Sequence, residues 1–257
     1  MAWIGGAPGA GKSTIARTLA CSLDLPLHPI DRWTYDHAGR MAPVRPLDLD
    51  LADGPEAAAD AFVRIARTRL ALAVEDVRAR GLSGVPALVE GPQLFPSMAA
   101  DVPAAVWLLP DAEQTRRARE ARLARVEDPE AAARLEGLLA RDAVLAQRVR
   151  DEAALHGRAV IEVPAEPDWP SITTAVRAQL DKLPRLAPGE DLARQREIEN
   201  LATCRQLRLW AADINLADVP AFDFTCECGR SGCCRTWSAT PDQYDVRRTT
   251  GRLVIRR

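Results

Sequence analysis

Residues 6–14 read GAPGAGKST and follow the opening segment Met-Ala-Trp-Ile-Gly. Four positions complete the pattern G-x-x-x-x-G-K-[ST]: Gly6, Gly11, Lys12 and Ser13. A short apolar segment, Trp3 to Gly5, precedes the pattern. Apolar residues follow it at helical spacing: Ile15, Leu19 and Leu23. The stretch therefore predicts a strand, a phosphate-binding loop and a helix.

The residue types in this stretch suit a triphosphate. Glycine allows backbone conformations that turn N–H groups onto phosphate oxygens. A helix that begins near Lys12 points its positive end at the same anion. We expect Lys12 to reach the β- and γ-phosphates and Ser13 to ligate Mg²⁺. The predicted ATP-binding set is Gly6, Gly9, Ala10, Gly11, Lys12, Ser13 and Thr14.

Composition excludes several classes of protein. The 257 residues include 36 acidic and 34 basic side chains, so the net charge is −2. This balance argues against nucleic acid as a partner. No apolar run approaches the roughly 20 residues of a membrane helix, and no basic leader precedes a cleavage site. Six cysteines, four of them clustered, do not form a secreted disulfide pattern. We expect a cytoplasmic protein without a membrane partner.

The first 183 residues alternate apolar strands with helices. Further strands are predicted over residues 25–30, 85–90, 104–109 and 159–163. A helix over 55–80 carries one apolar stripe: Phe62, Ala66, Leu70, Ala73 and Val77. This alternation predicts an α/β fold, a three-layer P-loop NTPase with a five-stranded parallel sheet. Ligands of such sheets bind at the carboxyl ends of the strands.

Two further phrases carry a family resemblance: PALVEGPQLFP at 86–96 and VWLLPDAEQTRR at 106–117. With GAPGAGKST, they make the first 180 or so residues resemble the small-molecule and nucleotide kinases of the P-loop class. That group includes adenylate- and shikimate-kinase-like enzymes and kinase-like actinobacterial proteins. The resemblance implies the P-loop fold and phosphoryl transfer, but names no acceptor. The chain lacks the N/T-K-x-D sequence of GTPases and an LSGGQ signature.

Acidic residues stand at the ends of two predicted strands. In resembling kinases a residue at the place of Asp31 contacts the acceptor and can take its hydroxyl proton. Asp31 is equally suited to capping the following helix. Glu90 is expected to hold Mg²⁺, directly or through water. Its alternative role is that of a solvated strand terminus.

Arginines are expected to close over the transferred phosphoryl group, where charge develops in the transition state. Arg116, Arg119 and Arg122 stand three residues apart on one predicted helix, and Arg141 is on the next. Alignment with resembling kinases selects Arg116 and Arg122 as catalytic, with Arg141 as a further candidate. The alternative is an ordinary solvated helix with Glu–Arg pairs.

The stretch after Asp31 is expected to cover the acceptor. It mixes aromatic and charged groups: Trp33, Tyr35, Asp36, His37 and Arg40. His37 is interpreted as a surface histidine, with general-base catalysis as the alternative. Residues 41–55 read as a loop, and residues 127–136 are placed as a lid over the site.

A proline-bearing linker after Leu183 predicts a boundary between residues 1–183 and an appendage, 184–257. A helix is predicted over 191–213, with these apolar positions: Ile198, Leu201, Leu207, Trp210 and Ile214. Cys226, Cys228 and Cys233 are candidate Zn²⁺ ligands, with Cys204 or another group as the fourth. Reduced structural cysteines are the alternative. The phrase FTCECG resembles a piece of actinobacterial proteins.

Two functions follow from these observations. The first is an ATP- and Mg²⁺-dependent kinase that moves the γ-phosphate to a hydroxyl of a small polar molecule. In this reading Lys12, Asp31, Arg116, Arg122 and Arg141 are catalytic, and Ser13 and Glu90 hold Mg²⁺. The second is a regulatory protein in which the bound nucleotide controls how the Cys-rich C-terminal region binds a protein partner.

Overall fold

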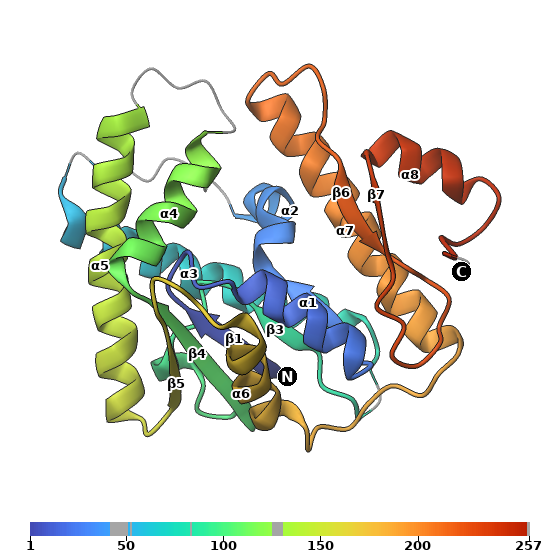
Figure 1. Cartoon of the computed structure of the whole chain (residues 1–257), viewed down its shortest axis with the longest axis horizontal. Helices are drawn as coiled ribbons and strands as arrows, with labels where there is room; N and C mark the ends of the chain where they lie inside the picture. The colour runs from blue at the N-terminus through green and yellow to red at the C-terminus, as the bar shows by residue number, and fades with distance from the viewer. Residues whose placement is uncertain (42–50, 52, 83, 125–130, 256–257) are drawn as a thin grey trace.

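The computed structural model describes residues 1–41, 51, 53–82, 84–124 and 131–255 of the chain. Its centre is a parallel five-stranded sheet in the order β2-β3-β1-β4-β5 (Figure 1). The strands are β1 (Ala2–Gly6), β2 (Leu27–Pro29), β3 (Leu88–Glu90), β4 (Ala104–Pro110) and β5 (Ala159–Val163). The predicted α/β class with a five-stranded parallel sheet is confirmed.

Strands β2 and β3 are shorter than the sequence predicts. Pairing between them runs only from Leu27 with Leu88 to Pro29 with Glu90. Pro26 and Pro86, which lie inside the predicted ranges, have no amide hydrogen to donate to a neighbouring strand. The ladder therefore starts after each proline.

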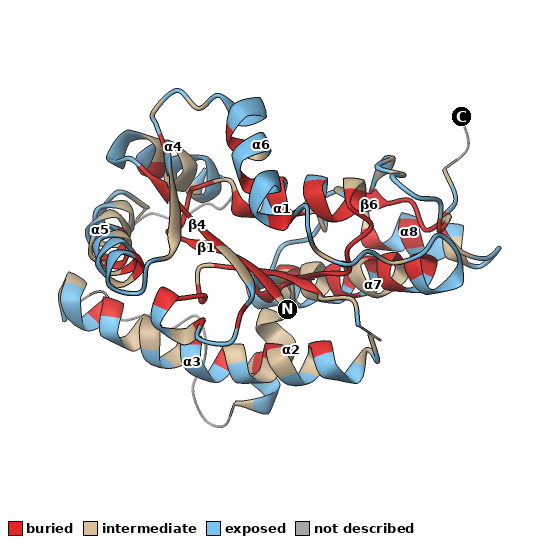
Figure 2. Cartoon of the chain, turned by 90° about the horizontal axis from the view of Figure 1, so that it is seen from below, coloured by how far each residue is buried: buried red, intermediate tan, exposed pale blue. Residues whose placement is uncertain are grey.

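Helices cover both faces of the sheet. Helices α1 (Lys12–Ser22) and α6 (Trp169–Leu180) lie on one face, and α3 (Pro55–Ala79) lies on the other (Figure 2). Helix α5 (Ala131–Leu155) packs beside α3. Strands β1, β2 and β3 are completely buried and β4 is mostly buried, as parallel strands covered on both faces must be, whereas the edge strand β5 is only partly buried.

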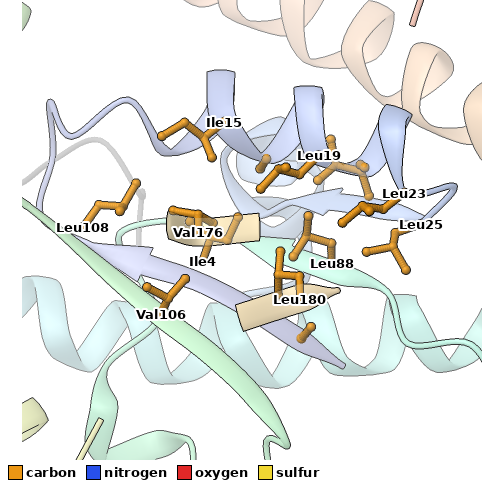
Figure 3. Close-up of a cluster of buried hydrophobic side chains, with 14 of the residues drawn as sticks. Ile4, Ile15, Leu19, Leu23, Leu25, Leu88, Val106, Leu108, Val176 and Leu180 are labelled. Carbon is orange, nitrogen blue, oxygen red and sulfur yellow. The ribbon is translucent and has the colours of Figure 1, made fainter. Parts of the chain in front are cut away.

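Alternation along the strands divides the core into two layers. Ile4, Val106 and Leu108 point toward α1 and α6, where they meet Leu19 and Val176 (Figure 3). The intervening residues of the same strands point to α3 and α5: Trp3, Trp107 and Leu109. The stripe predicted for α3 is confirmed, because all five of its residues belong to this second layer. Burial of these two apolar layers is the main force that holds the helices on the sheet.

The order of the strands sets the position of the site. The chain leaves β1 toward β2 and β3, and leaves β4 toward β5 on the opposite side. The connections therefore diverge next to β1, where open α/β sheets form a ligand crevice at the strand ends. The short helices η1 (Ile30–Trp33), α2 (Thr34–Arg40), η2 (Pro96–Met98) and α4 (Ala112–Leu123) complete this part of the chain.

The C-terminal residues form a helix, a hairpin and a second helix. These are α7 (Glu190–Asp213), the antiparallel pair β6 (Phe222–Thr225) and β7 (Thr236–Ala239), and α8 (Pro241–Arg248). Phe224, Tyr244 and Leu253 form their small core. Helix α7 packs against α2, η1 and β2 (Figure 1). The Leu27 amide of β2 donates to Glu199 Oε1 of α7 at 2.8 Å, so α7 is bonded directly to the main sheet.

The apolar face predicted for α7 is only partly correct. Leu201 is exposed, whereas the buried face includes Arg196, Asn200 and Cys204. The polar members of this face are satisfied by distant groups. Arg196 donates to Cys21 of α1, and Asn200 donates to Thr225 and Glu227. Helix α7 is thus fastened through polar contacts rather than through a simple apolar stripe.

No helix in the described part of the chain combines the length and the apolar composition needed to cross a membrane.

Candidate active site

The loop between β1 and α1 is built around glycines in left-handed conformations. Gly6, Gly9 and Gly11 have φ angles of +117°, +89° and +73°. A Cβ atom on Gly6 would collide with the Leu108 carbonyl of β4. A Cβ atom on Gly11 would lie 2.6 Å from the Trp169 ring. Only glycine fits these positions without rearrangement. The loop is therefore closely seated at the end of the sheet.

Lys12 begins α1 and its side chain is buried. Its Nζ atom donates to the Ala7 carbonyl at 2.7 Å, across the loop. Burial lowers the pKa of Lys12 to about 8, and the carboxylates of Glu90 and Asp31 act in the opposite direction. The ammonium group is thus held under the loop, where a bound anion would raise its pKa and favour the charged form.

Glu90 ends β3 opposite Lys12 and is also buried. Burial raises the pKa of Glu90 to about 7, Asp31 adds to this, and Lys12 and the Ser13 hydroxyl oppose it. Its Oε2 atom has no hydrogen-bond partner among the described residues. A buried carboxylate oxygen without a partner is costly, and beside a hydroxyl it is a suitable ligand for a hard cation such as Mg²⁺.

Asp31 lies in η1, directly after β2. Its carboxylate accepts from Gln93 Nε2 at 2.8 Å and lies 3.7 Å from Arg69. Half of the side chain, 54%, is exposed. Neither η1 nor α2 has a side-chain cap, so the alternative role of Asp31 as a helix cap is wrong. Gln93 and Arg69 orient the carboxylate and leave it accessible.

These groups line one cavity of about 390 Å³, which we call the loop cavity. Residues 8–14 form one side of it, and Asp31 and Glu90 lie on another. Five cationic side chains face it: Lys12, Arg69, Arg119, Arg122 and Arg141. Two carboxylates line the cavity and a third, that of Asp142, pairs with Arg119 and Arg141, so the five cations still leave a positive field, which favours an anion.

The structure brings Arg122 and Arg141 to the loop cavity and leaves Arg116 outside its lining. Arg116 is half exposed and pairs with Glu136 at 2.9 Å. The reason lies in helix geometry. A step of three residues turns the helix by about 300°, so a series at this spacing drifts around the axis. Arg119 and Arg122 reach the cavity, and Arg116 lies farther around.

Two residues that line the loop cavity are not among the catalytic residues predicted from the sequence. The sequence places Arg119 in a series with Arg116 and Arg122 and gives it no catalytic role. Arg69 is not among the predicted site residues, although it interrupts the apolar stripe of α3 between Ala66 and Ala73. Its guanidinium donates to the Ile30 carbonyl at 2.7 Å and to Thr34 Oγ1 at 2.8 Å. The sequence signal for Arg69 is a charged residue on an otherwise apolar stripe.

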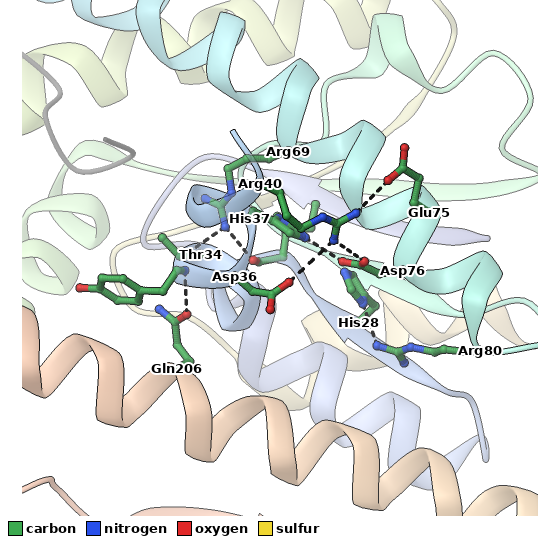
Figure 4. A network of polar contacts seen from close by, with 12 residues as sticks. His28, Thr34, Asp36, His37, Arg40, Arg69, Glu75, Asp76, Arg80 and Gln206 are labelled. Atoms are coloured by element: carbon green, nitrogen blue, oxygen red, sulfur yellow. Dashed lines mark hydrogen bonds and ion pairs between the residues drawn. The ribbon is translucent and has the colours of Figure 1, made fainter. Parts of the chain in front are cut away.

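A polar network lies behind the site, between α2 and α3 (Figure 4). His37 Nε2 is 2.9 Å from Asp76 Oδ2, and Arg80 donates to His28 Nδ1 at 2.7 Å. Both histidines are completely buried, so the interpretation of His37 as a surface residue is wrong. His28, His37 and Asp76 are close enough to share a cation. Two guanidinium groups, of Arg40 and Arg80, already bind this cluster and repel one. The network therefore fixes α2 against α3.

A second cavity, of about 690 Å³, opens beside the loop cavity, and we call it the outer cavity. Four residues line both: Ser13, Asp31, Glu90 and Arg122. The two spaces therefore meet at the predicted magnesium ligands and the predicted base.

Three cysteines converge in the turn between β6 and β7. The Sγ atoms of Cys226, Cys228 and Cys233 lie within 4.8 Å of one another, so the group can hold a metal ion. Cys204 lies instead in the small C-terminal core beside Phe224, which excludes it as the fourth ligand in this arrangement.

The loop expected over 41–55 lies outside the described residues at 42–50 and 52. The same holds for the expected lid at residues 127–130, and residues 131–136 begin α5. No protein-family model matches the chain, and no curated protein matches it at significant similarity.

Proposed function

We propose that the chain is an ATP- and Mg²⁺-dependent phosphotransferase that moves the γ-phosphate to a hydroxyl of a small molecule. The observation that carries the proposal is the junction of two cavities. A positively charged cavity at a glycine-rich loop meets a second cavity at Ser13, Asp31, Glu90 and Arg122. A triphosphate in the first and an acceptor in the second would place the reacting atoms at this junction.

The binding roles follow from charge. Loop amides and Lys12 bind the β- and γ-phosphates, and the N-terminus of α1 adds its positive dipole. Arg119, Arg122 and Arg141 face the phosphoryl group as its charge spreads over the equatorial oxygens. Ser13 and Glu90 would hold Mg²⁺. When bound, this ion neutralises phosphate charge and aligns the γ-phosphate.

In the transfer step, the acceptor oxygen forms a bond to the γ-phosphorus. The bond from that phosphorus to the β,γ-bridging oxygen breaks, and ADP leaves with the electron pair. The hydroxyl proton passes to the Asp31 carboxylate, which Gln93 and Arg69 orient toward the junction. Atoms and charge balance without a further reactant.

Thermal unfolding with Mg-ATP tests nucleotide binding. The chain has only two lysines, so Lys182→Ala, an exposed change on the other one, is the matched control for Lys12→Ala. Ligand at about 100 times its Kd adds about 2.7 kcal/mol of stability. We expect this in the wild type and in Lys182→Ala, and not in Lys12→Ala. Equal stabilisation of all three would overturn the assignment of Lys12, and none in the wild type would overturn the proposal.

A second function, a nucleotide-switched binding protein, is favoured by one contact. Arg17 of α1 donates to the Asp223 carbonyl, and its guanidinium lies 4.5 Å from the Phe222 ring centre. The helix that would bind phosphate thus touches the C-terminal hairpin directly. This function would be favoured if the chain binds a partner protein only when both the hairpin and Mg-ATP are present, and phosphorylates no acceptor.

We further propose that the three-cysteine group binds Zn²⁺. Burial raises the pKa of Cys226 to about 11, but backbone N–H groups of Ile255 and Cys228 donate to its sulfur. Burial opposes ionisation of Cys228, but the Arg230 amide, the Cys233 and Cys226 thiols and the Arg230 charge together lower its pKa. Amide donors of this kind stabilise the thiolates that ligate zinc. Cys234 contacts Cys21 of α1 instead, so the described residues supply three of the four ligands of a tetrahedral zinc site.

A further inference from the structure

The far wall of the outer cavity comes from the C-terminal part of the chain. Its lining there is largely apolar: Leu207, Trp210, Leu216, Pro220, Ala221 and Phe222. Leu216 keeps 38% of its surface exposed. The other lining residues include the charged groups of the junction, such as Asp31 and Glu90, and Arg32 of η1. The lining is therefore polar where the N-terminal residues supply it and largely apolar where the C-terminal residues do.

This wall is fixed in place by the main sheet and its helices. The Tyr35 hydroxyl donates to Asp213 at 2.9 Å, and its amide donates to Gln206 at 3.3 Å. Arg32 of η1 lies 4.0 Å from the ring centre of Phe222, and Arg17 approaches the same ring. Cation–π contacts from two elements hold the ring at the cavity edge. The wall is thus ready to receive a ligand without ordering itself first.

Shape and chemistry together limit the ligand. The volume of about 690 Å³ falls in the range of about 300–1,000 Å³ that is typical of small-molecule sites. A sugar or linear polyol carries hydroxyls on every side, and the apolar wall would leave several of them without partners. A ring system with a hydroxyl at one end matches both parts of the lining. An aromatic ring also suits the indole of Trp210.

We propose that the C-terminal segment 206–222 forms the acceptor-binding wall and selects hydroxylated molecules with an apolar ring over simple polyols. This inference rests on the proposed function, since it places the acceptor beside Asp31. It assigns the appendage a role in substrate choice. Trp210 and Leu216 are then specificity-determining residues and take no part in phosphoryl transfer.

The test measures binding to the full chain without nucleotide, so that it does not depend on ATP. Saturation-transfer NMR compares alcohols with an apolar ring (2-phenylethanol and cyclohexylmethanol) with polyols (glycerol and myo-inositol). Four proteins are used: wild type, Trp210→Ala, Leu216→Asn and Leu209→Ala. Leu209 is the matched control, because it neighbours Trp210 on α7, is 41% exposed and does not line the cavity.

We expect at least one ring-bearing alcohol to bind the wild type and Leu209→Ala, with affinity about tenfold or more lower in Trp210→Ala and Leu216→Asn. Leu216 is partly exposed, so its replacement keeps the test valid even if Trp210→Ala does not fold. Preferential binding of polyols, equal binding by all four proteins, or no binding of any probe overturns the inference. Failure of the proposed function would appear separately, as loss of stabilisation of the wild type by Mg-ATP.

Discussion

Arg119 and Arg141 share one buried carboxylate, that of Asp142. Arg119 Nε donates to Asp142 Oδ2 at 2.7 Å, and Arg141 donates to Oδ1 at 2.7 Å. The two arginines come from different helices, α4 and α5, and both face the loop cavity. One anion therefore sets the positions of two cations that would otherwise repel each other at the site.

Asp142→Asn is expected to disorder this pair of arginines. The amide offers one acceptor instead of two and no charge, so one guanidinium loses its partner. Removal of one member of a buried ion pair costs about 3–5 kcal/mol. Urea denaturation should show a loss of this size, and titration should show weaker binding of Mg-ATP. Asp151→Asn, an exposed change on the same helix, is the control. Unchanged stability and unchanged nucleotide binding would show that the carboxylate is not needed to hold the arginines.

Asp31→Asn separates binding from transfer. The side chain is half exposed and its partner Gln93 can turn its amide to the new group, so the fold is expected to persist. Mg-ATP should bind within about twofold of the wild-type Kd, while transfer falls by about 10²–10⁴, the usual contribution of a general base. Single-turnover transfer from labelled ATP to an identified acceptor measures this. Asp60→Asn, at an exposed Asp on α3, is the control. Full transfer by Asp31→Asn would eliminate Asp31 as the base.

The sequence predicts best the features that depend on neighbouring residues. The glycine pattern, the apolar stripe of α3 and the alternation of strands with helices are all local, and the structure confirms the sheet and the stripe. The positions of Glu90 and Asp31 are predictable because strand ends meet at one edge of a parallel sheet. Their proposed chemistry stays a prediction.

Features that depend on distant partners were not predictable in the same way. The buried face of α7 contains Arg196 because Cys21, 175 residues earlier, accepts from it. Arg69 enters the loop cavity because Thr34 and the Ile30 carbonyl, more than 30 residues away, bind its guanidinium. Periodicity reports how apolar a helix face is, and says nothing of a polar group whose partner lies elsewhere in the fold.

Gly6→Ala is expected to destabilise the whole fold. Gly6 has a φ of +117°, and a Cβ atom there meets the backbone of Leu108, which cannot move without disturbing β4. Backbone strain alone costs about 1–3 kcal/mol, and the collision adds to it. Gly39→Ala is the control, because nothing lies within 4 Å of its Cβ position in helix α2. It should be neutral or stabilising by up to about 1 kcal/mol. Equal urea midpoints for the two variants would contradict the claim that only glycine fits at position 6, against the backbone of Leu108.

Cys228→Ser tests the zinc site. The wild type is expected to hold about one Zn²⁺ per chain, and the variant to lose it, because two thiolates are too few for a stable site. Mass spectrometry of the metal content after incubation with zinc and desalting measures the difference. Cys234→Ser is the matched control, since Cys234 lies next to Cys233 but outside the group. A wild type that retains no zinc after this treatment would refute the assignment.

His28 gives the fold a dependence on pH that does not involve the nucleotide. Burial, and then the charge of Arg80, lowers the pKa of His28 well below its usual 6.5. Arg80 donates to Nδ1, so that atom must stay unprotonated for the contact to persist (Figure 4). Below about pH 6.5 the unfolded chain therefore binds the proton more readily than the folded chain. Stability is present above pH 6.5 and falls as the solution is acidified.

The slope of this loss should approach, at most, about 1.4 kcal/mol per pH unit for one proton. In His28→Asn, a side-chain oxygen near the position of Nδ1 still accepts from Arg80 but does not titrate, so the variant should lose stability less steeply between pH 6.5 and 5. His156→Gln, at an exposed histidine, should keep the wild-type slope. Urea denaturation at each half pH unit measures all three proteins. If His28→Asn loses stability as steeply as the wild type, a group other than His28 causes the acid sensitivity.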